Sequence, residues 1–271
     1  MIDNFENLSR KILGNIDGNY SNNTRIENLS KIYKEKNIRK ILIMGLNPAG
    51  DDSSYDKKFI GYIPDLPKSY DKLVYKYKNL FNTGYFKTNY NLFSEIIPRP
   101  KMTWGIDEKV KKELGKELLE NCDETFVNNV IEGILENEED ETPRLIFGDL
   151  IYYHKTNSQY IKKVVNKQYK NNTEDLKKNI FKMLDKHIEM FNPSMIIVTN
   201  AYASNLIYSF VKKKDFLNGE LKGEDVTEDM IKYKNIPIIF SGMVSRGNMD
   251  NYSYFRLKNR IKEIYDDVKN N

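Results

Sequence analysis

The stretch that decides the fold is Lys40-Ile41-Leu42-Ile43-Met44-Gly45-Leu46-Asn47-Pro48, an apolar run that ends in a Gly/Asn/Pro turn. The run is nearly continuous rather than alternating, which is typical of a strand covered on both faces, as in a parallel sheet. Three later runs share this character, so the sequence predicts a central sheet of four mainly parallel strands. These runs are Leu145–Phe147, which continues after Gly148-Asp149 into Leu150–Tyr153, then Met195–Thr199 and Ile236–Phe240.

Helical patterns lie between these runs. Thr24–Lys36 and Thr173–Phe191 each begin at a threonine, a residue type that caps helices, and carry apolar residues at helical spacing. Ala201–Lys213 and Asn251–Lys269 follow the third and fourth strands. Strands that alternate with helices predict an α/β fold, here a three-layer αβα sandwich.

The segment from Asp51 to Thr142 breaks this alternation, because it is too long for one crossover. It holds loop residues and two further predicted helices, Asp107–Leu119 and Glu124–Glu136. We interpret residues 52–142 as an elaborated connection over the carboxyl end of the sheet, within a single domain that spans residues 1–271.

Composition narrows the possible chemistry. The chain has one cysteine, Cys122, and two histidines without metal-ligand spacing, His154 and His187, so we expect no metal and no cofactor. The net charge of +4 is compatible with nucleic acid and does not require it. No apolar run reaches the ~18 to 20 residues that span a bilayer, and the first residues are acidic. We therefore expect a cytoplasmic monomer with no membrane association.

The turn after the first strand is the leading candidate site, since ligands of open parallel sheets bind outside the carboxyl ends of the strands. Gly45 allows close backbone approach, the amide of Asn47 can hold a water, and Asp51 can activate it. An ordinary strand-to-loop turn is the alternative. Leu46 and Pro48 belong to the same turn.

Two further strand ends carry polar residues. Asp149 interrupts an apolar run, where it could accept hydrogen bonds from a base or from a backbone turn. Alternatively, the strand ends at Phe147 and Gly148-Asp149 is a plain turn. Asn200 follows the third strand, where it can cap the next helix and still contact a ligand.

The loop after the fourth strand combines glycine, hydroxyl and guanidinium groups that can hold a phosphate. Its candidate residues are Ser241, Gly242, Ser245 and Arg246. The alternative is that Asp250 or Asn251 caps the last helix and Arg246 pairs with a local carboxylate.

The first and last of these motifs resemble the uracil-DNA glycosylase superfamily. Gly45-Leu46-Asn47-Pro48 is similar to the Gly-x-Asn-Pro-Gly turn of its mismatch-specific and single-strand-selective branches. The resemblance covers approximately residues 38–52 and 143–265. It implies that Asn47 positions the hydrolytic water, that Phe59 or Tyr62 stacks on the base, and that Asp149 lies where an amide usually reads the base. Ser241-Gly242-Met243-Val244-Ser245-Arg246 stands where the family has a His-Pro-Ser or Asn-Pro-Ser motif.

The resemblance implies a DNA glycosylase-like hydrolase that removes uracil or another deaminated or mismatched base from single-stranded or mismatched DNA in repair. Asn47, Asp51, Ser245 and Arg246 would carry the reaction. One alternative is an inactive nucleic-acid or nucleotide-binding protein on the same fold. Another is an unrelated small-molecule enzyme that uses the same strand ends.

Overall fold

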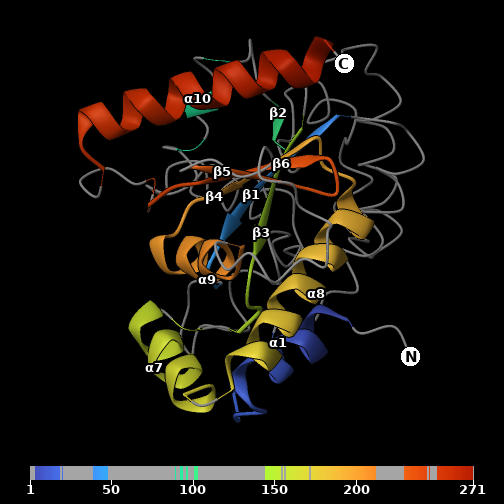
Figure 1. Cartoon of the computed structure of the whole chain (residues 1–271), viewed down its shortest axis with the longest axis vertical. Coiled ribbons are helices and arrows are strands. Elements are labelled where there is room, and N and C mark those ends of the chain that lie inside the picture. The colour runs from blue at the N-terminus through green and yellow to red at the C-terminus, as the bar shows by residue number, and fades with distance from the viewer. Residues whose placement is uncertain are drawn as a thin grey trace, which may run out of the picture.

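The computed structural model describes residues 4–18, 20, 39–47, 89, 92–93, 96, 101–102, 144–153, 155, 157–170, 172–211, 229–242, 244 and 249–270. Their fold is α/β, as predicted (Figure 1). The elements are α1 (Phe5–Leu13), β1 (Lys40–Gly45), β2 (Lys101–Met102), β3 (Arg144–Asp149), α7 (Ser158–Gln168), α8 (Thr173–Phe191), β4 (Met195–Val198), α9 (Ala201–Val211), β5 (Met230–Tyr233), β6 (Ile236–Phe240) and α10 (Asn251–Asn270).

The sheet has the strand order β2-β3-β1-β4-β6-β5. The four predicted strands are all present as β1, β3, β4 and β6, and they pair in parallel. β1 lies between β3 and β4 with residues 40–44 buried, which explains its continuous apolar sequence.

The prediction of four strands is wrong, because the described part of the chain has six. β2 contributes only two residues, too few to leave a pattern in the sequence. β5 pairs antiparallel with β6 through a two-residue turn, Lys234-Asn235, in which both residues have positive φ, 50° and 64°. Such hairpin turns usually contain glycine. Because this turn has none, the sequence did not predict the hairpin.

The second strand also ends differently from the prediction. β3 includes Gly148 and Asp149, so the alternative of a strand that stops at Phe147 is wrong. Leu150–Tyr153 does not continue the strand: the chain turns there, and Tyr153 forms only an isolated bridge to Tyr20.

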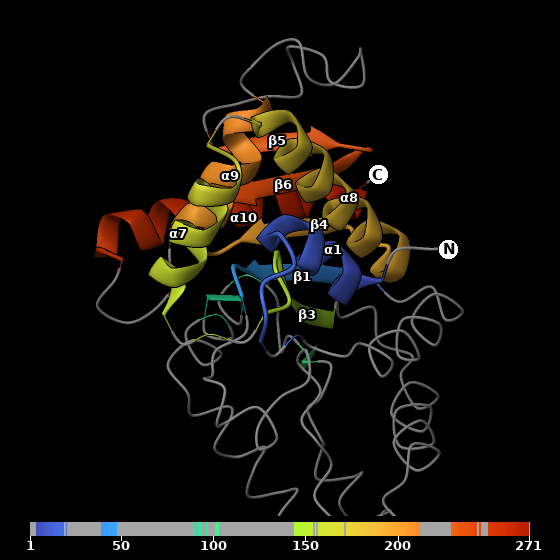
Figure 2. The same cartoon turned by 90° about the horizontal axis from the view of Figure 1, so that it is seen from below.

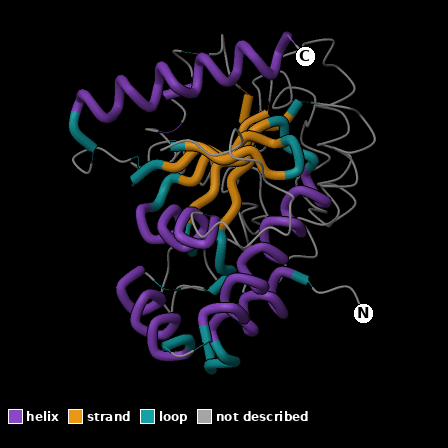
Figure 3. The backbone as a smooth tube through the Cα atoms, in the orientation of Figure 1, coloured by secondary structure: helices purple, strands orange, loops and turns teal. Residues whose placement is uncertain are grey.

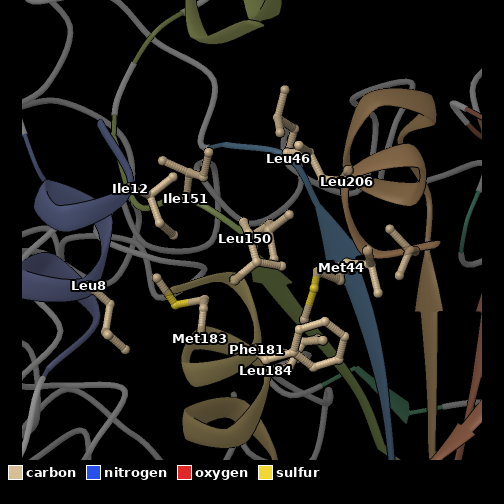
Figure 4. Close-up of a cluster of buried hydrophobic side chains, with 14 of the residues drawn as sticks. Leu8, Ile12, Met44, Leu46, Leu150, Ile151, Phe181, Met183, Leu184 and Leu206 are labelled. Atoms are coloured by element: carbon tan, nitrogen blue, oxygen red, sulfur yellow. The ribbon is translucent and has the colours of Figure 1, made fainter. Parts of the chain in front are cut away.

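Helices cover both faces of the sheet. Leu42 and Met44 of β1 pack in one core with α1, α8 and α9, whereas Ile41 and Ile43 pack in the other core with α10. This alternation is the expected consequence of a strand's two-residue period. Figure 2, from below, shows α1, α7, α8 and α9 on the near side of the sheet and α10 behind it, and Figure 3 shows the sheet between the helices. Figure 4 shows side chains of the first core.

Helix ends follow local capping chemistry. α8 begins at Thr173 as predicted, but its N-cap is Asn172, whose side chain accepts from the backbone N–H of Asp175 at 3.3 Å. α1 and α7 were not predicted. Asn4 and Asn157 cap them, and asparagine is a strong N-cap. The predicted helices Thr24–Lys36, Asp107–Leu119 and Glu124–Glu136 lie outside the described residues.

Candidate functional site

The candidate site is the edge of the sheet where β1 and β3 end together. Gly45 and Asp149 are partners in the parallel register. The pairing continues beyond the strands, because the backbone N–H groups of Leu150 and Ile151 donate to the carbonyls of Gly45, at 3.1 Å, and Leu46, at 2.9 Å. The turn after β1 and the turn after β3 are therefore fixed side by side.

Asn47 ties these two turns together. Its side-chain nitrogen Nδ2 donates to the backbone carbonyls of Tyr153, at 3.2 Å, and Lys155, at 2.7 Å. Because a carbonyl only accepts, the two contacts assign the nitrogen and oxygen of this amide. The oxygen Oδ1 is then the hydrogen-bond acceptor of this amide. A neutral amide orients a water but is a weak base.

Asp149 is a buried acid at the carboxyl end of β3. Only 3% of its surface is exposed. A carboxylate removed from water is stabilised by hydrogen-bond donors around it and cannot itself donate when ionised. Its backbone N–H donates to the hydroxyl of Tyr152 at 3.5 Å, so the main chain at this position is also held from within the protein.

A buried hydrogen-bond chain supports Asp149 from the α8 side of the sheet. Nδ1 of His187 lies 2.7 Å from the carbonyl of Met183, so Nδ1 carries the proton, and Nε2 accepts from the hydroxyl of Tyr152 at 3.0 Å. Burial lowers the pKa of His187 to about 4 and raises the pKa of Tyr152. The ring of Phe5 packs against both, with ring centroids 4.6 Å apart in each case. The neutral imidazole thus has a structural role.

The other strand ends are joined to β1 by hydroxyl and backbone groups. Thr199 donates to the carbonyl of Met44 through its backbone N–H, at 2.9 Å, and its hydroxyl, at 3.3 Å. The hydroxyl of Ser204 donates to the backbone carbonyl of Ser241 at 2.8 Å. The backbone N–H of Ser241 donates to the backbone carbonyl of Val198 at 2.9 Å. The carboxyl ends of β1, β4 and β6 therefore form one connected edge.

Asn200 caps α9, as predicted. Its side-chain oxygen accepts from the backbone N–H groups of Tyr202, at 2.9 Å, and Ala203, at 3.1 Å. Asp250 caps α10 in the same way, accepting from the backbone N–H and the hydroxyl of Ser253 at 2.9 and 2.7 Å. These bonds, the one from the Ser253 hydroxyl most, lower the pKa of Asp250.

A cavity between α7 and α9 was not predicted. Its volume is about 230 Å³. The hydroxyl of Tyr202 donates to the side-chain oxygen of Asn166 on α7 at 3.2 Å, and burial raises the pKa of Tyr202 to about 12. The lysine-rich sequence of α7 was the available signal for this region. The residues that line the cavity are Ser158, Gln159, Lys162, Asn200, Ala201, Tyr202 and Asn205.

The structure brings together part of the predicted site. Gly45, Leu46, Asn47 and Asp149 share one end of β1 and β3, and Asn200, Ser241 and Gly242 lie at the ends of β4 and β6. Gly242 is exposed, and no atom lies within 4 Å of where its Cβ would be. Six predicted residues lie outside the described ranges: Pro48, Asp51, Phe59, Tyr62, Ser245 and Arg246.

Two features are absent from the described residues. No group of three or more His, Cys, Asp or Glu side chains in these ranges could hold a metal ion. None of the helices in them has the length and apolar character needed to cross a bilayer. Comparison with known proteins gives no match, either to a protein-family model or to a curated protein sequence.

Proposed function

We propose that this protein hydrolyses the N-glycosidic bond of a damaged or mismatched base in DNA at the joint end of β1 and β3. The observation that carries the proposal is the register pair of Gly45 and Asp149. It puts a buried carboxylate beside the turn that holds Asn47, whose amide is already oriented by two backbone carbonyls. A water-holding group and a base-holding group are thus the two parts that this edge supplies.

Each residue has a distinct role in this mechanism. Asn47 holds the water through Oδ1, and Asp149 accepts N–H groups of a base that has left its stack. The water oxygen bonds to the sugar carbon C1′, and the base departs with the electrons of the broken C1′–N bond. Asp51 takes the proton from the water, and the departing base takes a proton from solvent. Ser245 and Arg246 hold the phosphate, and Phe59 or Tyr62 stacks on the base.

The architecture supports this proposal without requiring it. Helices on both faces of the sheet fit a three-layer αβα domain of uracil-DNA glycosylase type, and the first motif ends the strand between β3 and β4. We further propose that the protein is cytoplasmic and acts in DNA repair.

A second candidate is a nucleic-acid or nucleotide-binding protein on the same fold that does not cleave. The observation that favours it is the engagement of Asn47. Its amide holds two backbone carbonyls, a structural role that needs no reaction, and without Asp51 its weakly basic oxygen cannot activate a water. The Asp149 carboxylate could then bind a base that is never released.

One assay separates the two candidates. Single- and double-stranded oligonucleotides that contain uracil, hypoxanthine, xanthine or mismatched thymine are incubated with the protein, and abasic sites are detected by alkaline strand cleavage. We expect excision from at least one of them and its loss in Asn47→Ala. Asn259→Ala, an exposed change on α10, is the matched control. Binding without excision from any of these oligonucleotides would favour the second candidate, and wild-type rates in Asn47→Ala would remove Asn47 from the site.

A further inference from the structure

Positive charge is concentrated in one segment near the candidate site. Residues 155–172 contain five lysines and no aspartate or glutamate, in a chain whose net charge is only +4. The segment follows β3 in the chain and contains α7. It begins at Lys155, whose backbone carbonyl accepts from the side-chain amide of Asn47 at 2.7 Å. In the rest of the chain, taken as a whole, acidic residues nearly balance the basic ones.

The lysines of α7 share one exposed face. Ile161 and Val165 are buried, and α7 packs beside α1. The opposite face is exposed, and its residues recur at helical spacing, which makes a continuous stripe along the helix. Figures 1 and 2 show α7 beside α9 at the outside of this helix layer. We call these residues the α7 stripe: Gln159, Lys162, Lys163, Asn166 and Lys167.

The charges of the α7 stripe are not neutralised by neighbouring acids. Within the ranges that the structure describes, Lys162, Lys163 and Lys167 form no ion pair. By contrast, Lys177 on α8 is paired with Glu174 at 2.8 Å. The Nζ of Lys162 lies 5.7 Å from the ring centroid of Tyr202 on α9.

The cavity between α7 and α9 opens beside the stripe and is suited to one planar, polar group. Its volume of about 230 Å³ is below the roughly 300 to 1,000 Å³ of pockets for larger ligands. Gln159 and Asn205 provide amides that can donate and accept, and Tyr202 provides an aromatic ring. Amides, an aromatic ring and an adjacent lysine, Lys162, are the groups that bind an unstacked nucleotide.

We propose that the α7 stripe binds the phosphate backbone of single-stranded nucleic acid, with the cavity between α7 and α9 taking one nucleotide. The one large hydrophobic side chain exposed on α7 is Tyr160, whose ring stacks on Tyr153 with centroids 6.3 Å apart, whereas helices that lie on membranes insert a row of apolar side chains. A polyanion that needs no apolar contact therefore fits it better than a lipid surface. The interaction requires no catalytic group, so it goes beyond the excision activity and does not depend on it.

The test measures binding of the full-length protein to fluorescein-labelled oligothymidylate of about 20 nucleotides by fluorescence anisotropy, long enough to cover one binding site. The test variant carries Lys162→Gln, Lys163→Gln and Lys167→Gln. The matched control carries Lys178→Gln, Lys182→Gln and Lys186→Gln on α8, the same change of net charge. We expect the stripe variant to raise Kd about tenfold or more and to reduce the slope of log K against log salt by about 2 between about 50 and about 200 mM salt.

Three outcomes would overturn the proposal. One is the absence of oligonucleotide binding at the lowest salt by a wild-type protein with a cooperative thermal transition. The second is an equal rise in Kd in the α8 control, which would show that binding depends on the net charge and not on the position of the lysines. The third is binding to phosphatidylserine vesicles but not to the oligonucleotide. Oligothymidylate holds no damaged base, so binding without excision would support the α7 stripe even where the proposed hydrolysis fails.

Discussion

The side-chain nitrogen of Asn47 lies 2.7 Å from the backbone carbonyl of Lys155, 108 residues further along the sequence. This bond and its companion to Tyr153 connect the turn after β1 to the segment that leads into α7. The two regions for which we propose functions, the end of β1 and β3 and the α7 stripe, are therefore mechanically linked through one amide.

Replacing Asn47 by aspartate should show how much this link contributes to the stability of the folded protein. Asn47→Asp puts a carboxylate oxygen, which cannot donate, against two carbonyl oxygens. We expect the free energy of unfolding to fall by about 1 to 3 kcal/mol, the usual range for leaving buried polar groups without partners. Urea denaturation at neutral pH measures the change. Asn259→Asp on exposed α10 introduces the same charge and should change stability by less than about 0.5 kcal/mol. Equal effects in the two variants would contradict a structural role for the Asn47 amide.

His187 should make the protein sensitive to mild acid. Its pKa is about 4 in the folded protein, because burial disfavours the charged ring, and 6.5 is its ordinary value. Below pH 6.5 the unfolded chain therefore binds a proton that the folded protein does not, so stability falls as the pH falls. The loss continues down to about pH 4 and amounts to about 3 kcal/mol, at about 1.4 kcal/mol for each pH unit.

The difference in the free energy of unfolding between the wild type and His187→Gln isolates this effect, because the titration of the carboxylates is common to both proteins. The variant should be less stable at pH 7, because it loses the bonds to Tyr152 and Met183, and the gap should narrow as the pH falls from 6.5 to about 4. Urea denaturation at several pH values gives both curves. If the free energies of unfolding of the two proteins change in parallel between pH 6.5 and about 4, the pKa of His187 is not lowered by burial.

The sequence predicted the sheet's centre better than its edges, and the reason is physical. Four central strands are buried on both faces, so each needs a continuous apolar run that is visible in the sequence. β5 depends instead on the positive φ of Lys234 and Asn235; asparagine adopts this conformation readily, but lysine does not, and no glycine marks the turn. α1 and α7 were missed because they are short amphipathic helices whose burial comes from each other and from α8.

The location of the candidate site could be predicted from the sequence, but its contacts could not. The strand-end rule located Asn47 and Asp149 at one edge, since parallel strands end together. It could not show that the Asn47 amide is held by Tyr153 and Lys155, because partners 106 and 108 residues away leave no local pattern. The α7/α9 cavity is likewise made by two helices that are distant in the sequence.

Alanine should destabilise the protein at one glycine of the candidate motifs and be tolerated at another. A Cβ at Gly148 would lie 3.1 Å from Cδ1 of Leu42 and 3.2 Å from Nε2 of His187, both in a packed core. We expect Gly148→Ala to lower the free energy of unfolding by about 1 to 3 kcal/mol, as overpacking does. Gly242→Ala meets no atom within 4 Å and should stay within about 0.5 kcal/mol of the wild type. Thermal or urea unfolding of both variants checks the pair, and a loss at Gly242 as large as that at Gly148 would contradict this description of the core.

Asp149 should decide which base the site accepts, if the proposed hydrolysis is correct. A carboxylate accepts hydrogen bonds but cannot donate one to a base carbonyl, whereas an asparagine amide does both. Uracil presents an N–H beside a carbonyl, whereas cytosine presents an amino group beside an unprotonated ring nitrogen, so Asp149→Asn should raise excision of uracil relative to cytosine. The measurement is the ratio of excision rates on matched oligonucleotides, which cancels any general loss of activity. Asp149→Ala, which removes both kinds of contact, should lower all rates. An unchanged ranking of bases in Asp149→Asn would mean that the buried carboxylate stabilises the end of β3 without touching the base.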